Sequence, residues 1–242
     1  MTSKSKGIFW IALVVLVAIY FSNGIALLVH LIPHSTEREI AEKLNVHFHP
    51  NLCVNPYPET QKVLDKFVAR LFPIAGLDSD KDFQLRIQFI HNDEVNAFAT
   101  LGGDIYVYSG LLRDVSSPEE LAGVIAHEMA HQKERHILQG IFASLIMGSN
   151  AVPDSFFKIA FSQSQEREAD ELGLKRLKAA QINAQGYVDF FNKRGSEPDW
   201  LKLFNSHPGS KNRMELARQY LNLPSRSILD KKEWALLRNY CL

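Results

Sequence analysis

The stretch "VIAHEMAHQKERH", from Val124 to His136, determines how the rest of the chain is interpreted. His127 and His131 stand four residues apart, and Glu128 directly follows the first histidine. On a helix, residues i and i+4 lie on one face, so both imidazole rings can bind one metal ion. Glu128 leans toward the same side and can reach a metal-bound water without being a ligand itself. The spacing therefore predicts a zinc site on a helix.

This helix is predicted to begin at "SPEE", where Ser117 suits the N-cap, Pro118 the first turn and Glu120 the capping-box position. The following segment, "LAGVIAHEMAH", carries no charged residue except Glu128, so we expect the helix to be largely buried. A buried His-Glu-His cluster is costly unless it is hydrogen-bonded or bound to metal. A hydrogen-bonded pair of core histidines without metal is the alternative.

A catalytic zinc ion needs a third protein ligand and an open fourth position. His136 is expected to point elsewhere on the helix. The later stretch "SQSQEREADELG" places Glu166 and Asp170 at i and i+4 on a second helix. Glu166 can bind zinc while Asp170 accepts a hydrogen bond from the outer nitrogen of a ligand histidine. Glu168 is the rival ligand, but it has leucine at its own i+4 position, and a solvated charged face is the further alternative.

Together, the motifs His127-Glu128-x-x-His131 and Glu166-x-x-x-Asp170 resemble the gluzincin metallopeptidases, specifically family forty-eight. That family includes the HtpX-like, CAAX-prenyl-protease-like and Oma-type membrane-associated enzymes. The resemblance runs from about residue 96 to residue 213. It implies one Zn²⁺ ion per chain, with Glu128 as the base that activates water. It also implies a role like that of the small exported members, which act in envelope protein quality control.

Two further segments carry the resemblance. "NAFATLGGDIYVYSGLL" is similar to the segment before the family's active-site helix, including the edge strand that pairs with substrate; this implies a substrate strand at Gly103, Asp104, Ile105 and Tyr106. "SHPGSKNRM" is similar to a later His-Pro and Arg motif, which implies that His207 and Arg213 lie at the site. His207 could donate to the oxyanion or close the open zinc position, and a plain turn histidine is the alternative. Arg213 could orient His207 or a carboxylate, or lie on the surface.

The predicted elements indicate an α+β fold. Helices are expected at Thr36 to Val46 and at Glu59 to Phe72. The alternation in "DFQLRIQFIHND" predicts a strand, and "VNAFATLGGDIYVYSGLL" predicts two strands with Gly102-Gly103 at the turn. Mostly helices follow. With the resemblance, this order predicts a mostly helical, zincin-like metallopeptidase domain with a small β-sheet, preceded by one N-terminal transmembrane helix.

The N-terminal segment Ile8 to Ile32 is almost continuously apolar, and a bilayer is crossed by about 20 residues. A retained anchor is favoured over a cleaved signal peptide, because the apolar run continues past the small residues near Ser22. Lys4 and Lys6 precede the span, which by the positive-inside rule places residues 1–7 in the cytoplasm. Residues 8–32 are then the anchor, and residues 33–242 form a metallopeptidase domain, with its active-site core at about 82–221, on the periplasmic side of the inner membrane. The reverse orientation remains an alternative.

The net charge and the cysteine content of the chain limit the functions that it can have. The 242 residues have a formal net charge of +0 and no basic cluster, which excludes an electrostatic nucleic-acid surface. Cys53 and Cys241 either form one disulfide or remain free thiols. The sequence predicts a membrane-anchored zinc endopeptidase whose partners are unfolded or misassembled polypeptides. A non-catalytic zinc-binding chaperone or adaptor of the same fold is the alternative, and the intact Glu128 speaks against it.

Overall fold

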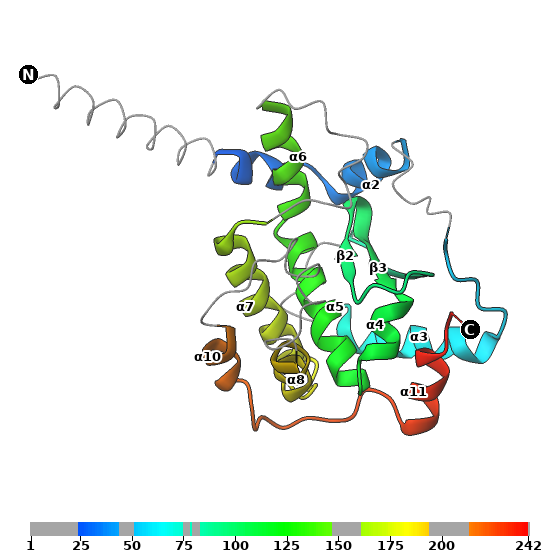
Figure 1. Ribbon diagram of the computed structural model, residues 1–242. Helices are drawn as coiled ribbons and strands as arrows, with labels where there is room; N and C mark the ends of the chain where they lie inside the picture. The colour runs from blue at the N-terminus through cyan, green and yellow to red at the C-terminus, as the bar shows by residue number, and fades with distance from the viewer. Residues whose placement is uncertain are drawn as a thin grey trace, which may run out of the picture.

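A computed structural model describes residues 24–43, 51–74, 78, 83–146, 161–193 and 213–241 (Figure 1). Most of the predicted anchor, residues 8–23, falls outside these ranges. Within them, none of the helices combines the length and the apolar character that crossing a bilayer requires. His207 also lies in a part of the chain that the structure does not describe.

The sheet has three strands in the order β1-β3-β2. Strands β2 (Ala97–Ala99) and β3 (Asp104–Tyr108) form the predicted antiparallel hairpin, joined through the short 3-10 turn η1 (Leu101–Gly103). Both turn glycines have positive φ, and a Cβ on Gly103 would lie 1.9 Å from a backbone oxygen, so only glycine fits there. Strand β1 (Arg86–Ile90) pairs with β3 in parallel.

Helices make up more than half of the residues that the structure describes, in agreement with the predicted α+β class (Figure 1). Helix α5 lies at the centre, with α7 and α8 on one side and β2 and β3 on the other. The helices are α2 (His34–Lys43), α3 (Pro58–Leu71), α4 (Ser109–Asp114), α5 (Pro118–Lys133), α6 (His136–Ile146), α7 (Gln163–Ala179), α8 (Gln185–Lys193), α10 (Arg213–Arg218) and α11 (Lys231–Arg238).

Helix α5 begins where the capping residues predict. The Ser117 hydroxyl accepts a hydrogen bond from the Glu120 amide at 3.2 Å, while the Glu120 carboxylate accepts from the amide of Ser116 at 3.0 Å. Such a cap typically stabilises a helix by about 1 kcal/mol. Every residue from Glu120 to Gln132 is buried. The predicted burial of this helix is confirmed.

The two cysteines form a disulfide, which is one of the two alternatives that the sequence left open. Cys53 follows the isolated bridge between Leu52 and Ile90 at the outer edge of β1, and Cys241 follows α11. The disulfide therefore links the segment after α11 to the β1 edge of the sheet, and β2 forms the opposite edge.

Candidate metal centre

Two histidines and one glutamate face a common point between α5 and α7. His127 Nε2 lies 3.1 Å from His131 Nε2 and 3.5 Å from a Glu166 carboxylate oxygen, and His131 Nε2 lies 3.3 Å from the other oxygen of Glu166. Zinc–ligand distances of about 2.0–2.2 Å in a tetrahedron separate the ligand atoms by about 3.3–3.6 Å. The two ring nitrogens and the Glu166 carboxylate therefore have close to the spacing that one zinc ion needs, and all three side chains are buried.

The close approach of α5 and α7 brings these ligands together. Gly173 of α7 faces the backbone of Ala126 and His127, where an added Cβ would lie only 3.2 Å from the nearest atoms. Ser162 caps α7 and exchanges hydrogen bonds with Gln165 in a capping box. Glu166 thus lies in the first turn of α7, where the helix dipole favours a negative charge.

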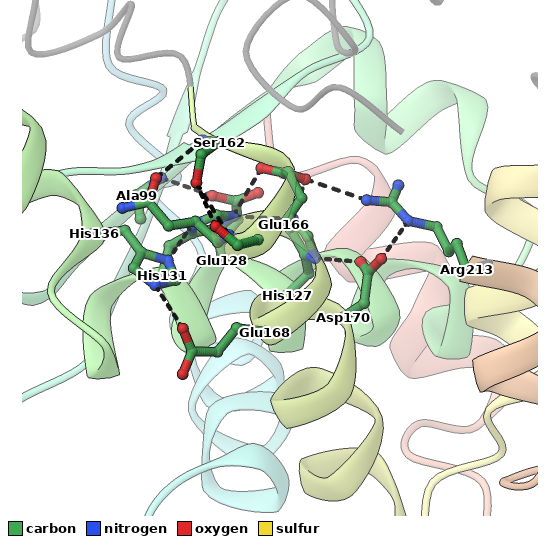
Figure 2. A network of polar contacts seen from close by, with 12 residues as sticks. Ala99, His127, Glu128, His131, His136, Ser162, Glu166, Glu168, Asp170 and Arg213 are labelled. Atoms are coloured by element: carbon green, nitrogen blue, oxygen red, sulfur yellow. Dashed lines mark hydrogen bonds and ion pairs between the residues drawn. The ribbon is translucent and has the colours of Figure 1, made fainter. Parts of the chain in front are cut away.

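The Asp170 carboxylate holds the outer side of His127. One oxygen lies 3.0 Å from His127 Nδ1 and accepts a hydrogen bond from the Tyr187 hydroxyl at 2.6 Å. The other accepts from Arg213 Nε at 2.7 Å, and Arg213 Nη2 also donates to Glu166 at 3.2 Å (Figure 2). Burial alone would raise the pKa of Asp170, but the hydrogen bond from His127 and the charge of Arg213 outweigh it and lower that pKa. The acid is therefore kept as a carboxylate.

A second chain of contacts, which the sequence did not reveal, holds the outer side of His131. Its Nδ1 lies 2.9 Å from Nδ1 of His136, and His136 Nε2 lies 3.3 Å from the carboxylate of Glu168 (Figure 2). Burial lowers the pKa of His136 despite the nearby carboxylate, so the ring is neutral. If His131 held a metal ion through Nε2, its Nδ1–H would donate to His136, and His136 Nε2–H would donate to Glu168.

The expectation that His136 points away from the site is wrong, because the helix does not continue through it. Helix α5 ends at Lys133, Arg135 has a positive φ of 54°, and a separate helix, α6, begins at His136. Glu168, the rival third ligand, contacts His136 rather than either histidine of the triad in the contacts that the structure shows. The geometry therefore favours Glu166 as the third ligand.

Glu128 lies beside the triad without being part of it. Its side chain is buried and its Oε2 accepts a hydrogen bond from the Ala99 amide at 3.0 Å (Figure 2). This bond ties the carboxylate to β2 and fixes its orientation. A carboxylate in this position can accept a proton from a water held at the triad.

The predicted substrate strand is wrong in its position. Strand β3 lies in the middle of the sheet, paired with β1 on one side and with β2 on the other, so residues 103–106 offer no free edge. Asp104 and Tyr106 are fully buried. The hairpin was recognised from the sequence, but the parallel partner β1 occupies the edge that β3 was expected to expose. Among the described strands, β2 has the free edge next to α5.

The profile of peptidase family M48 matches residues 58–151 and 138–221. The chain belongs to peptidase family M48. It is 28% identical over 165 residues to the beta-barrel assembly-enhancing protease of Escherichia coli (strain K12), covering 55% of this chain and 34% of that protein. It is 33% identical over 144 residues to the mitochondrial metalloendopeptidase OMA1 of Arabidopsis thaliana, covering 52% and 29%. It is also 31% identical over 153 residues to the metalloprotease LoiP of Escherichia coli (strain K12), covering 53% and 60%.

These matches confirm the resemblance seen in the sequence, and with it the prediction of a zinc metallopeptidase. They cover a little more than half of the chain. The chain spans about a third of the length of the beta-barrel assembly-enhancing protease that it matches.

Proposed function

We propose that this chain is a membrane-anchored zinc endopeptidase that hydrolyses peptide bonds of unfolded or misassembled proteins. The observation that carries the proposal is the buried triad of His127, His131 and Glu166 with the carboxylate of Glu128 beside it. A bound zinc ion would polarise the substrate carbonyl and make the attacking water more acidic. Glu128 accepts the proton of that water and delivers it to the leaving amine.

The free edge of β2 is the site that we propose for the substrate backbone. The backbone groups of Thr100 and Asn96 form hydrogen bonds with β3. Because successive residues of a strand alternate in direction, the backbone groups of Ala97 and Ala99 point away from β3. An extended peptide paired there is held through its backbone, and such pairing selects little sequence, as suits unfolded polypeptides. Both alanines are buried in the structure and the Ala99 amide donates to Glu128, so substrate binding requires a rearrangement that uncovers this edge and releases that amide.

The cellular setting is also a proposal. One relative is named for enhancing β-barrel assembly and another as a mitochondrial metalloendopeptidase. These names support a role in envelope protein quality control. The apolar residues 8–32 would anchor the domain formed by residues 33–242 on the periplasmic side of the inner membrane, and the disulfide agrees with an oxidising compartment.

The substitution Glu128→Gln tests the activity. It keeps the size of the side chain but removes the proton acceptor, so cleavage of a loosely folded protein such as casein should fall by about 10²–10⁴-fold at matched zinc content. Glu120→Gln is the matched control, because it changes a buried glutamate of the same helix that lies at the N-terminal cap of α5 and outside the triad. Equal cleavage by wild type and Glu128→Gln would contradict the mechanism.

If neither protein cleaves while both bind substrate, the non-catalytic chaperone or adaptor gains support, unless the site is closed. His207→Ala distinguishes the two cases. A gain of cleavage would show that His207 closes the zinc position, and continued inactivity would favour a binding protein.

A further inference from the structure

A second cluster of metal-binding side chains lies at the other edge of the sheet. Cys53 Sγ, Cys241 Sγ and a ring nitrogen of His91 all lie within 4.8 Å of one another. Cys53 is buried, Cys241 is half-buried and His91 is exposed. The zinc triad adjoins β2, whereas this cluster adjoins the outer edge of β1, so the two groups share no residue and no strand.

The positions of these residues do not depend on the disulfide alone. The Cys53 amide donates to the Phe89 carbonyl at 2.8 Å, and the His91 amide donates to the Asn51 carbonyl at 2.9 Å, so the chain segments carrying both residues are paired through their backbones. We therefore expect Cys53 and His91 to stay adjacent when the disulfide is broken.

Cys241 is held from the other side by its neighbour Tyr240. The ring of Tyr240 lies 4.4 Å from that of Phe89, and its carbonyl accepts a hydrogen bond from Asn55 at 2.9 Å. An ion pair between Lys66 of α3 and Glu233 of α11 fixes the helix that precedes it. We therefore expect these contacts to keep the second sulfur next to the first when the disulfide is broken.

We propose that the reduced chain binds a zinc ion at Cys53, Cys241 and His91, and that the disulfide and the metal are alternative occupants of this site. A dithiol reductant supplies two electrons and two protons to the disulfide and becomes a disulfide itself. Zinc then displaces the two thiol protons and binds two thiolates and one imidazole. Two sulfurs and one nitrogen are a donor set that zinc favours, and the exposed side of His91 leaves the fourth position to water.

In either state the C-terminal helix α11 would remain linked to the sheet edge, by a covalent bond or by a metal. Reduction without metal would leave that link to noncovalent contacts such as those of Tyr240 and Lys66. This inference does not depend on the proposed peptidase activity, because the cluster contains none of the residues of the zinc triad.

Cobalt(II) provides the test, because a thiolate bound to cobalt gives a strong charge-transfer absorption and the zinc triad contains no sulfur. The oxidised full-length chain should show no such band. After reduction with a phosphine, the band should appear and saturate at about one equivalent beyond the triad, and zinc content should rise from about one to about two per chain. Cys241→Ser should abolish the band. His91→Ala should weaken cobalt binding at this site by at least about tenfold, whereas His30→Ala, which changes a histidine of the proposed anchor and outside this cluster, should not.

Three results would overturn the proposal. The first is the absence of the band in the reduced wild type. The second is an unchanged affinity in His91→Ala. The third is loss of the native circular dichroism spectrum on reduction, because the sulfurs would then not be held in place without the disulfide.

Discussion

The substitution Asp170→Asn perturbs both the stability of the fold and the metal centre. The Asp170 carboxylate is fully buried and faces three donors, which are His127 Nδ1 at 3.0 Å, the Tyr187 hydroxyl at 2.6 Å and Arg213 Nε at 2.7 Å. Asparagine has the same size, but one of its two terminal atoms is a donor. Whichever way the amide is oriented, at least one of the three donors loses its acceptor.

Both orientations of the amide have a calculable cost. If the NH₂ group faces Arg213, the buried guanidinium loses its ion pair with Asp170 and keeps the one with Glu166, and breaking a buried ion pair costs about 3–5 kcal/mol. If it faces His127, the ring loses the carboxylate that fixes its tautomer, which typically lowers metal affinity about 10–100-fold. We expect the free energy of unfolding without metal to fall by about 3 kcal/mol, because Glu166 remains. Zinc affinity should fall about 10–100-fold.

Asp78→Asn is the matched control. Asp78 forms a largely buried pair with Arg176, at 2.7 and 2.6 Å, and Arg176 lies about 15 Å along α7 from Glu166. This variant should lose about 3–5 kcal/mol of stability while its zinc affinity stays unchanged.

Denaturant unfolding in the presence of a chelator measures the first quantity, and competition with a chromophoric chelator measures the second. Equal zinc affinities in Asp170→Asn and Asp78→Asn would refute the assignment of Asp170 to the metal centre. If Asp170→Asn does not fold, Tyr187→Phe removes a single donor and should still weaken zinc binding measurably.

Three further predictions concern the ligands, pH and topology. Metal analysis should show that Glu166→Gln loses far more zinc than Glu168→Gln, and equal losses would mean that Glu166 is not the third ligand. The zinc affinity of His136→Ala should be about 10–100-fold lower than that of wild type. Burial would lower the pKa of His127, but the neighbouring carboxylates raise it to about 10, and zinc must displace that proton. Zinc affinity should therefore rise about tenfold per pH unit from about pH 6 to 9, and a flat profile in a competition titration would contradict this. A reporter active only outside the cytoplasm should be active when fused to the C-terminus, and the opposite pattern would reverse the topology.

The metal centre was predictable from the sequence because its geometry is local. The spacing of His127 and His131 places two rings on one helical face, and the same spacing places Glu166 and Asp170 on a second helix. Such i and i+4 relations follow from helix geometry alone. The only distant information needed was that the two faces meet, and Gly173 at the contact allows this.

The features that the sequence did not reveal depend on contacts between distant residues or on a single backbone angle. Strand β3 is central because Arg86 of β1 pairs beside Asp104, and neither strand's own pattern specifies that parallel partner. The position of His136 follows from the positive φ of Arg135, a conformation that the residues "KERH", without glycine or asparagine, do not indicate. Helix α4 likewise begins within the segment predicted as a strand, after Tyr108.

The two ligand histidines are supported in different ways, and this difference has a consequence for the metal centre. His127 is held by Asp170, a buried carboxylate that Arg213 also binds, so its surroundings are closed and ionic. His131 is held by a neutral His136, whose own partner Glu168 is half-exposed. Changes on the first side therefore alter folding and metal binding together, because a buried ion pair is broken. Changes at Glu168 leave no buried charge unpaired, so they alter the metal affinity with little effect on the fold.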